Sequence, residues 1–262
     1  MFAYAGGQMN LLPLLNKLIP AHATYVEVFA GGATLFWNKQ PSETEILNDI
    51  DSRLVNMLDM VRDDHVEFAR QLALLPNSRE IYNKFKVNIV TEKDKMKRAV
   101  MYYYMLLNTW SGKSAGGTFV SKKRNTSKID GLEWFSRRLR HVCIENIDCV
   151  KLIKKYDSPN TFYFLDPPYV EVGNVLYEHH FHQKDHIRLA KALSKIEGLF
   201  LITYNNHPLI DLLYRKFPRF IYENVVTMSR GKTKRLQEHI IAGNYDVLNR
   251  DFEPFTSTYF RF

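Results

Sequence analysis

Short apolar runs that stop abruptly at glycine or acidic residues restrict the fold of this 262-residue chain more than any other feature. Three runs rich in β-branched and aromatic residues, and a shorter apolar run, are typical of buried strands. They are residues 24–29, 160–165 and 199–204, with the shorter run at 45–47. The first run is followed by Gly31-Gly32 and the second by Asp166. These stops predict turns at the carboxyl ends of the strands.

Helical patterns separate the expected strands. A helix is expected from about Thr34, and the segment before residue 199 repeats apolar residues on one helical face. The residues on that face are Ile187, Ala190, Leu193 and Ile196. Strands that alternate with helices predict an α/β fold with a doubly wound, mostly parallel sheet. Ligands bind such sheets beyond the carboxyl ends of the strands.

The alternation of strands and helices disappears between residues 56 and 143. From residue 52 to about residue 97, apolar residues recur at three- and four-residue steps, which predicts amphipathic helices. These apolar residues are Leu54, Leu58, Val61, Val66, Ala69, Leu72 and Leu75. We therefore expect a mainly helical subdomain at 56–143, inserted into a larger domain formed by residues 1–55 and 144–262.

Positive charge is concentrated in two segments of the chain. The whole chain has 36 Lys and Arg residues against 28 Asp and Glu residues, a formal net charge of +8. Most of this excess lies at 113–140 and at 230–235, both rich in the Ser, Thr, Gly and Asn of exposed loops. Such loops indicate contacts with nucleic-acid phosphates, with merely solvated loops as the alternative. The candidates are Lys113, Lys122, Lys123, Arg124, Lys128, Arg137, Arg138, Arg230, Lys232 and Lys234.

The cysteine and histidine content argues against a disulfide framework and against a metal site. Cys143 and Cys149 are too few for either disulfide staples or a four-cysteine zinc site, so we expect reduced core thiols and a cytoplasmic location. His179, His180 and His182 have no carboxylate at ligand spacing, so no metal is expected. No apolar run approaches the roughly 20 residues of a membrane helix, and we expect no membrane segment.

A glycine turn follows the first expected strand, in the segment Glu27-Val-Phe29-Ala-Gly31-Gly32. Glycines allow the backbone to approach a ligand closely, although the dinucleotide spacing G-x-G-x-x-G is absent. Asp49 stands at the end of the next expected strand. A carboxylate in that place can accept hydrogen bonds from both hydroxyls of a ribose. The pattern favours a nucleoside cofactor, with a helix N-cap as the alternative role for Asp49.

The sequence Asp166-Pro167-Pro168-Tyr169 directly follows a buried strand and is the sharpest chemical signal. Two prolines fix φ and lack amide donors, so the carbonyls beside them point in set directions. An acidic side chain next to such a carbonyl forms a clamp with two acceptors for an NH2 group. An exocyclic amine needs this clamp because its lone pair is delocalised into the ring. Tyr169 offers a stacking face for the base that carries the amine.

In this order, the motifs resemble those of the DNA adenine-N6 methyltransferases of the Dam type, the D12 class, over nearly the whole chain. Residues 166–169 resemble the catalytic D-P-P-Y of that family. The other matches are residues 4–8 with its aromatic-A-G-G-K segment, 27–32 with its methyl-donor motif, 48–51 with its ribose-binding motif and 238–245 with its closing E-x-x-I-x-N-Y. Together the matches are far more specific than D-P-P-Y alone.

The resemblance implies the Rossmann-like fold of S-adenosylmethionine-dependent methyltransferases, in which the helical insert is a DNA-recognition subdomain. It implies that Asp166, Pro167, Pro168 and Tyr169 are the catalytic residues. A flipped base would be enclosed by Tyr169, Tyr177 and Phe181. The implied contacts of S-adenosylmethionine are Tyr4, Gly7, Gln8, Glu27, Phe29, Gly31, Gly32, Asp49 and Asp166.

The implied activity is site-specific methyl transfer from S-adenosylmethionine to N6 of an adenine flipped out of double-stranded DNA. We expect a bacterial or phage-encoded monomer or weak dimer, which works alone or beside a cognate restriction endonuclease. The sulfonium is already an activated donor, so the reaction needs no metal.

Two departures from the family pattern keep other functions open. Gln8 stands where the family usually has Lys, and residues 108–128 only loosely resemble the recognition segment, so the target sequence is not readable. The alternatives are methylation of cytosine N4 or of an RNA amine, since the same clamp suits any exocyclic amine, and a DNA-binding homologue that has lost turnover.

Overall fold

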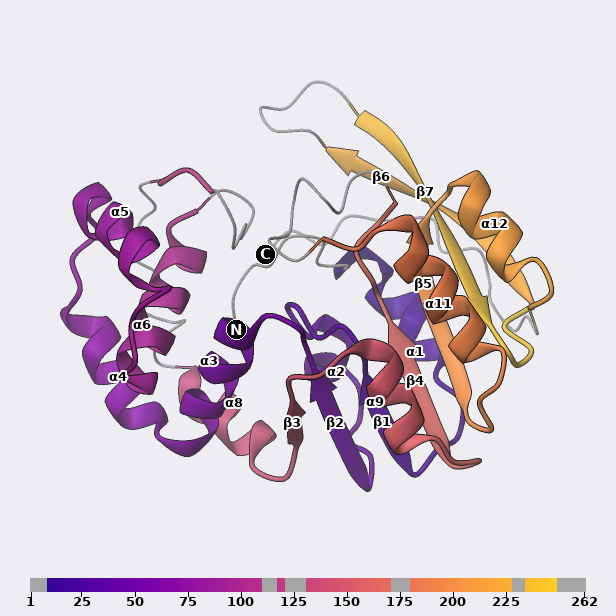
Figure 1. Cartoon of the computed structure of the whole chain (residues 1–262), viewed down its shortest axis with the longest axis horizontal. Helices are drawn as coiled ribbons and strands as arrows, with labels where there is room; N and C mark the ends of the chain where they lie inside the picture. Colours follow the sequence, from indigo (N-terminus) through magenta and orange to yellow (C-terminus); the bar gives the residue numbers. More distant parts are fainter. Residues whose placement is uncertain (1–8, 110–116, 121–130, 171–179, 228–233, 249–262) are drawn as a thin grey trace.

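A computed structural model describes residues 9–109, 117–120, 131–170, 180–227 and 234–248. These residues form a seven-stranded sheet in the order β3-β2-β1-β4-β5-β7-β6, with helices against it (Figure 1). The strands are β1 (Thr24–Glu27), β2 (Thr44–Asn48), β3 (Cys143–Glu145), β4 (Thr161–Leu165), β5 (Leu199–Asn205), β6 (Arg219–Thr227) and β7 (Lys234–Gly243). The helices are η1 (Met9–Leu11), α1 (Leu12–Leu18), α2 (Thr34–Asn38), α3 (Ser52–Asp63), α4 (His65–Leu74), α5 (Arg79–Asn88), α6 (Lys95–Leu107), α8 (Leu132–Leu139), α9 (Cys149–Tyr156), α11 (Gln183–Leu193) and α12 (Pro208–Tyr214).

The predicted doubly wound, mostly parallel sheet is confirmed. The four expected strands are β1, β2, β4 and β5, and with β3 they pair in parallel. Strand β7 is antiparallel to both of its neighbours, β5 and β6. The sequence patterns did not predict β3, β6 or β7. Strand β3 has only three residues, which is too short for a periodicity to be recognised.

Helices cover both faces of the sheet. Side chains alternate between these faces along each strand. On β1, Tyr25 belongs to the core shared with α1, α2 and α3, whereas Val26 belongs to the core shared with α9, α11 and α12. The same alternation separates Phe162 from Tyr163 on β4. Both faces of the central strands are therefore buried, as expected for strands that read as continuous apolar runs.

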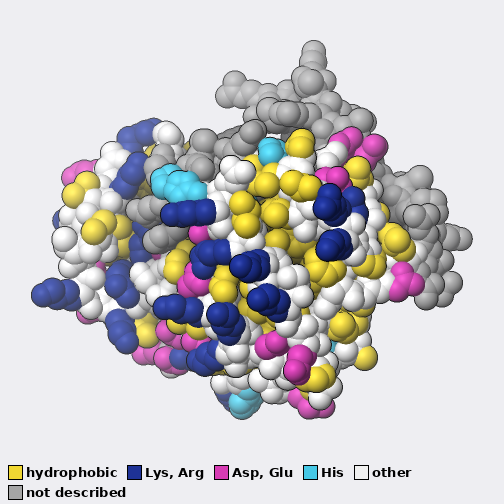
Figure 2. All heavy atoms as spheres, turned by 45° about the vertical axis from the view of Figure 1, so that its right-hand side comes forward, with side chains coloured by type: hydrophobic (Ala, Val, Ile, Leu, Met, Phe, Trp, Pro, Cys, Tyr) yellow, Lys and Arg dark blue, Asp and Glu magenta, His cyan; other side chains and the backbone are white. Residues whose placement is uncertain are grey.

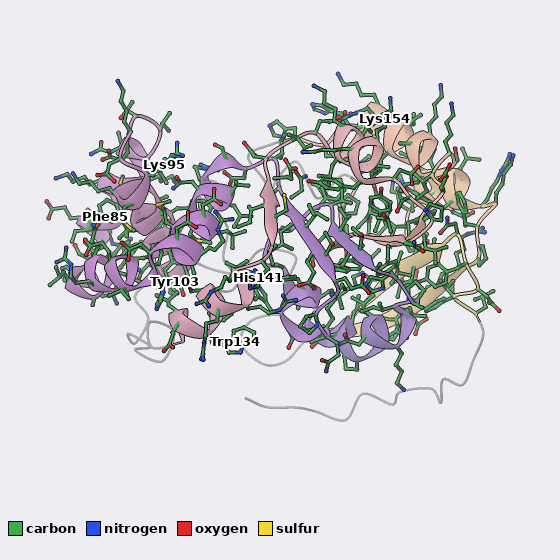
Figure 3. All side chains as sticks on the ribbon, turned by 90° about the horizontal axis from the view of Figure 1, so that it is seen from below. Phe85, Lys95, Tyr103, Trp134, His141 and Lys154 are labelled. Carbon is green, nitrogen blue, oxygen red and sulfur yellow. The ribbon has the colours of Figure 1, made fainter. Side chains whose placement is uncertain are left out.

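Helices α3 to α6 and α8 form a lobe beside β3 (Figure 1), which we call the helical lobe. Its side chains, such as Phe85 and Tyr103 in Figure 3, continue the core of the sheet domain without a break. Side chains of Asp51, Asp64 and other acceptors cap the amino ends of its helices and so mark where they begin. The expected boundaries of the insert at residues 56 and 143 fall inside α3 and β3.

Three expectations about burial were wrong. Val66 on α4 is 67% exposed and Ile187 on α11 is 44% exposed, although both fit the apolar periodicity of their helices. Both Cys residues are free, but Cys143 is exposed, and only Cys149 is a core thiol. Cys143 is the first residue of β3, an edge strand of the sheet. None of the helices described here has the length and apolar character needed to cross a membrane.

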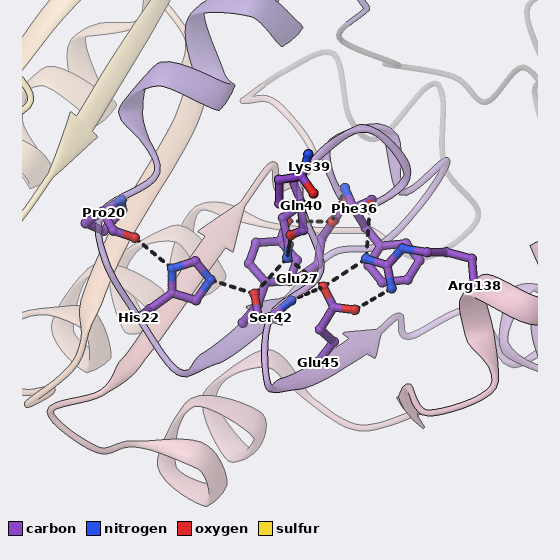
Figure 4. Close-up of polar contacts among 10 residues, drawn as sticks. Pro20, His22, Glu27, Phe36, Lys39, Gln40, Ser42, Glu45 and Arg138 are labelled. Carbon is purple, nitrogen blue, oxygen red and sulfur yellow. Dashed lines mark hydrogen bonds and ion pairs between the residues drawn. The ribbon is translucent and has the colours of Figure 1, made fainter.

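A buried ion-pair cluster joins the helical lobe to the sheet (Figure 4). Arg138 of α8 makes two hydrogen bonds to the Glu45 carboxylate on β2, and its guanidinium lies 3.8 Å from the centre of the Phe36 ring. Lys39 donates to the same carboxylate over 2.6 Å. Burial alone would raise the pKa of Glu45, but the hydrogen bonds from Arg138 and Lys39 outweigh it and lower the pKa. Glu45 is thus a charged acceptor that holds α8 against the sheet.

Candidate active site

The order of the strands places the candidate site between the carboxyl ends of β1 and β4. From β1 the chain proceeds outward to β2 and β3, and then returns to β4 on the other side of β1. Such a reversal leaves a crevice between the two central strands in which ligands of α/β proteins bind. The glycine turn follows β1 and Asp166 follows β4, so the two motifs meet at this crevice although they are far apart in the sequence.

The glycine turn includes two residues with a left-handed backbone, Gly31 and Ala33. Gly31 has a φ of 47°, in the left-handed region that side chains disfavour. Its amide donates to Asp49 Oδ2 over 2.8 Å, and the Trp37 indole donates to the Gly32 carbonyl over 3.0 Å. The turn is therefore held both from the end of β2 and from α2.

Asp49 fits the ribose of a nucleoside cofactor. It is half-buried at the carboxyl end of β2, where its two oxygens accept from the amides of Gly31 and Asp51. These two backbone hydrogen bonds orient a carboxylate, a group with about four acceptor positions in all. The N-cap of α3 is Asp51 instead, whose carboxylate accepts from the Arg53 amide. The alternative role of Asp49 as a helix cap is therefore wrong.

Glu27 is buried beside the glycine turn, at the end of β1. Only 2% of the residue is exposed, and its carboxyl accepts from the Tyr25 hydroxyl and from the Phe36 amide of α2. Burial raises the pKa of Glu27 to about 8, and the charge of Asp166 acts in the same direction. The expectation that Glu27 touches the cofactor does not fit this placement. Its contacts make it a support for the turn.

Asp166 is half-buried at the end of β4, and its carboxyl is oriented by the neighbouring strand. The Thr203 hydroxyl of β5 donates to Asp166 Oδ1 over 2.9 Å. Thr203 is itself fully buried, so water does not compete for this hydrogen bond. Pro167 is buried directly after Asp166. The acidic group of the expected clamp is thus fixed before any substrate binds.

Tyr169 is held by residues of two other strands. Its hydroxyl is in hydrogen-bond contact with Nδ1 of His239 on β7, at 3.1 Å. Its ring is tilted against the buried Tyr204 ring of β5, with centroids 6.3 Å apart. The hydroxyl of Tyr204 in turn contacts His186 of α11 at 2.8 Å. Burial lowers the pKa of His186 to about 4, so that this histidine is neutral at physiological pH.

Phe29 and Phe181 bring the two halves of the site into contact. Phe29 belongs to the glycine turn and Phe181 follows the D-P-P-Y motif, and their rings meet edge to face with centroids 5.6 Å apart. Phe181 also packs edge to face on His186. Both phenylalanines are half-buried, so they are still open on one side. Tyr177, the other expected pocket residue, lies outside the described residues.

Most of the other expected contacts cannot be placed. The N-terminal candidates Tyr4, Gly7 and Gln8 lie outside the described residues, and only the backbone of Lys234 is described. Seven other basic candidates lie entirely outside the described residues: Lys113, Lys122, Lys123, Arg124, Lys128, Arg230 and Lys232. Arg137 is exposed, whereas Arg138 is taken up in the buried cluster with Glu45. The expectation that Arg138 faces DNA therefore does not fit its placement.

Basic side chains also gather on one face of the sheet domain, outside the two predicted segments (Figure 2). Exposed lysines and an arginine of α9 and α11 lie on this side, and Lys154 points away from the sheet in Figure 3. They are Lys151, Lys154, Lys155, Lys184, Arg188 and Lys191. Several are paired with acidic neighbours, as Arg188 is with Asp148.

Thr203, Tyr204, His186 and His239 are the site residues that the sequence patterns missed. A weak signal existed for Thr203, a polar residue near the end of an apolar run on a strand expected beside Asp166. His239 stands inside the closing motif, but nothing local to that motif pairs it with Tyr169.

The family of the chain is shown by its sequence. The family model of the D12 class N6 adenine-specific DNA methyltransferases matches residues 4–228, which is most of the chain. The chain belongs to this family.

Individual relatives match over different lengths. The DNA adenine methylase of Escherichia coli strain K12 is 32% identical over 106 residues, which cover 39% of this chain and 38% of that relative. The Type II methyltransferase M.CviBI of Paramecium bursaria Chlorella virus NC1A is 23% identical over 249 residues, covering 90% of this chain and 91% of the relative. Among solved structures, a SAM-dependent O-methyltransferase from Thermotoga maritima matches with a TM-score of 0.37 at 10% identity, over 93% of this chain and 66% of that one.

The family uses S-adenosylmethionine as its methyl donor, and the described residues suit that cofactor. The glycine turn lets a ligand approach the backbone, and the oriented Asp49 carboxylate is placed for a ribose.

Proposed function

We propose that this protein transfers the methyl group of S-adenosylmethionine to N6 of an adenine flipped out of duplex DNA. The observation that carries the proposal is the Asp166 carboxyl at the crevice, which the Thr203 hydroxyl orients over 2.9 Å. Three residues later, the hydroxyl of Tyr169 is held by contact with His239. An acceptor and a stacking face in this arrangement suit a planar ring with an exocyclic amine.

The residues of the crevice divide the work of the reaction. Bound S-adenosylmethionine supplies a sulfonium methyl group, which is electrophilic without further activation. When the cofactor is bound, Asp49 would accept hydrogen bonds from the ribose hydroxyls and the glycine turn would border the methionine end. Asp166 and the Pro167 carbonyl would accept hydrogen bonds from the two N6 hydrogens, which orients the nitrogen lone pair for attack on the methyl carbon. As the N–C bond forms, the C–S bond would break, S-adenosylhomocysteine would leave as a neutral thioether, and one N6 proton would be released to water.

Tyr169 stacks on the flipped adenine and offsets part of the few kcal/mol that flipping costs. Phe181 lies at the border between the base and the cofactor, because its ring touches Phe29 of the glycine turn. The rings of Tyr169 and Phe181 are both half-buried, so each has exposed surface that a ligand can contact.

DNA approaches this crevice between the helical lobe and the β6–β7 hairpin, which carry the two basic segments at 113–140 and 230–235. Exposed Arg137 belongs to the proposed contact surface, and Arg138 only fixes the lobe in position. We further propose that the insert at 56–143 selects the target sequence. In this proposal the enzyme acts as a monomer or weak dimer on bacterial or phage DNA in the cytoplasm, alone or beside a restriction endonuclease.

The test is to incubate the protein with methyl-labelled S-adenosylmethionine and unmethylated duplex DNA, and to digest the product to nucleosides. We expect the label in N6-methyladenine, and labelling about 10³-fold slower with the Asp166→Ala variant. Label in N4-methylcytosine, or transfer only to RNA, would assign the same site to another amine. Full activity of the Asp166→Ala variant would refute the role of the clamp.

A further inference from the structure

A histidine from the last strand of the sheet reaches the proposed base-stacking residue. Although β7 runs antiparallel to β5, its register pairs His239 with Asn205, the last residue of β5. His239 therefore arrives at the same edge of the sheet as the carboxyl ends of β4 and β5. There its Nδ1 lies 3.1 Å from the Tyr169 hydroxyl, across 70 residues of sequence.

The surroundings of His239 favour a neutral, fixed ring. The residue is 5% exposed, and burial lowers the pKa of its imidazole below the ordinary value. A neutral imidazole offers one donor nitrogen and one acceptor nitrogen, so it can accept from or donate to a phenol depending on the tautomer. A buried contact of this kind has little competition from water.

The hydroxyl contact and the ring contacts together restrict Tyr169. The His239 ring stands edge to face with the Tyr169 ring, at 5.9 Å and 69°. The Tyr169 ring also packs against the Tyr204 ring, with an angle of 43° between the ring planes and 6.3 Å between the centroids. A tether at the hydroxyl limits the swing of the side chain, and the two neighbouring rings limit its rotation. An unrestrained Tyr169 would have to be ordered by the incoming base, which weakens binding.

We propose that His239 is a positioning residue, which holds the Tyr169 ring in the orientation that stacks on the target base. The inference rests on the proposed function, because it needs a base on Tyr169. His239 itself touches neither the cofactor nor the reacting atoms in this proposal. Its effect passes entirely through the Tyr169 hydroxyl and ring.

The test is a double-variant cycle on the full chain, with long unmethylated duplex DNA as substrate and S-adenosylmethionine affinity measured separately by calorimetry. His239→Leu removes the polar contact while filling the space, and Tyr169→Phe removes it from the other side. We expect each variant to raise the KM for DNA or lower kcat by about fivefold to tenfold, the size of one lost buried hydrogen bond, with cofactor affinity unchanged. The double variant should be no worse than either single variant, because both remove the same contact.

Two further variants separate positioning from a general loss of stability. His239→Asn places an amide near the position of Nδ1 and should recover most of the activity. His22→Leu is the matched control: its Nε2 has a similar contact, 2.8 Å from Ser42 Oγ, but it precedes β1 at the opposite edge of the sheet. We expect His22→Leu to lower the melting temperature without changing the KM for DNA.

The outcomes are distinguishable from failure of the proposed function. If the wild-type protein methylates DNA but the effects of Tyr169→Phe and His239→Leu simply add, or if His239→Leu matches wild type, His239 does not position Tyr169. If His239→Leu fails to fold, a Tyr169→Phe variant with wild-type kinetics overturns the inference by itself. A wild-type protein that transfers no methyl group to any nucleic acid overturns both proposals.

Discussion

The two halves of the candidate site are held by different kinds of contact. In the cofactor half, carboxyl groups accept hydrogen bonds from groups nearby in the sequence: Asp49 accepts from amides 18 and 2 residues away, and Glu27 from groups 2 and 9 residues away. In the base half, side chain meets side chain across long separations, 37 residues for Thr203 with Asp166 and 70 for Tyr169 with His239. Local contacts follow from a motif, whereas distant contacts follow only from the sheet.

This difference teaches that the halves should fail differently. Substitutions in the cofactor half should act on cofactor affinity or on stability, because its groups hold backbone in place. Substitutions in the base half should act on turnover and on DNA, because its groups orient other side chains. Four predictions test this division, and a fifth tests how the helical lobe is anchored to the sheet.

The largest effect is expected from Asp166→Ala in the base half. Loss of the amine acceptor should lower kcat by about 10³-fold, comparable to the loss of one oriented transition-state contact, while S-adenosylmethionine still binds. Single-turnover methylation and calorimetry measure the two quantities. Asp211→Ala, which removes an exposed carboxylate paired with Arg219, is the control and should retain wild-type turnover. Equal losses of turnover and cofactor affinity would erase the distinction between the halves.

Arg138→Met should destabilise the fold by about 3 kcal/mol, because it leaves the buried Glu45 carboxylate with Lys39 as its remaining cationic partner. Arg137→Met changes the preceding residue, whose side chain is 62% exposed, and should lower the free energy of unfolding by less than about 0.5 kcal/mol. Chemical denaturation measures both. Similar losses from the two variants would mean that the cluster does not anchor α8.

Glu27→Gln should make stability less dependent on pH. The folded pKa of about 8 lies above the ordinary 4.5, so the contribution of Glu27 is complete below pH 4.5 and is lost as pH rises through about 8. Between pH 6 and pH 8 the wild type should lose about 2 kcal/mol relative to the Gln variant, which keeps the acceptor oxygen. Denaturation series at several pH values measure this, and parallel curves for the two proteins would show that Glu27 is already ionised.

Asp49→Ala should weaken S-adenosylmethionine binding by about tenfold or more, the cost of losing hydrogen bonds to a charged acceptor. The turnover of fully loaded enzyme should change much less. Calorimetry and methylation at saturating cofactor separate these effects. A variant with normal cofactor affinity and slow turnover would move Asp49 out of the cofactor half.

Thr203→Val should have the smallest effect, about fivefold on kcat, because it removes one net hydrogen bond of about 1 kcal/mol and preserves the shape of the side chain. Cofactor affinity should not change. Steady-state methylation kinetics measure the loss, and Thr203→Ser, which keeps the hydroxyl, should restore the rate. A Ser variant as slow as the Val variant would point to packing and not to orientation of Asp166.

Prediction from the sequence succeeded where the signal was local. The strands at 24–29, 45–47, 160–165 and 199–204 were found because both faces of each are buried, which leaves apolar runs bounded by turns. It failed for β7, where His239 and other polar residues interrupt the pattern. It also failed for the faces of single helices, since Val66 and Ile187 are exposed in spite of correct spacing.

The site shows the same limit. Asp49, Asp166 and the glycine turn were placed correctly at one edge, because parallel strands bring their carboxyl ends together. Glu27 and Arg138 were misjudged, because a charged residue in a motif or in a basic run is assumed to be exposed. Burial and pairing of these side chains depend on Tyr25, Phe36 and Glu45, and neither motif indicates those contacts.

The sequence by itself determined the α/β class, the family and the residues that end the central strands, because each depends on composition and spacing over a few neighbouring residues. The tertiary structure decided which of those residues are available to a ligand and which are spent on support. It alone brought Thr203 to Asp166 and His239 to Tyr169. The physical reason is that strand order and register, set by packing of the whole core, place side chains from distant segments within hydrogen-bond distance.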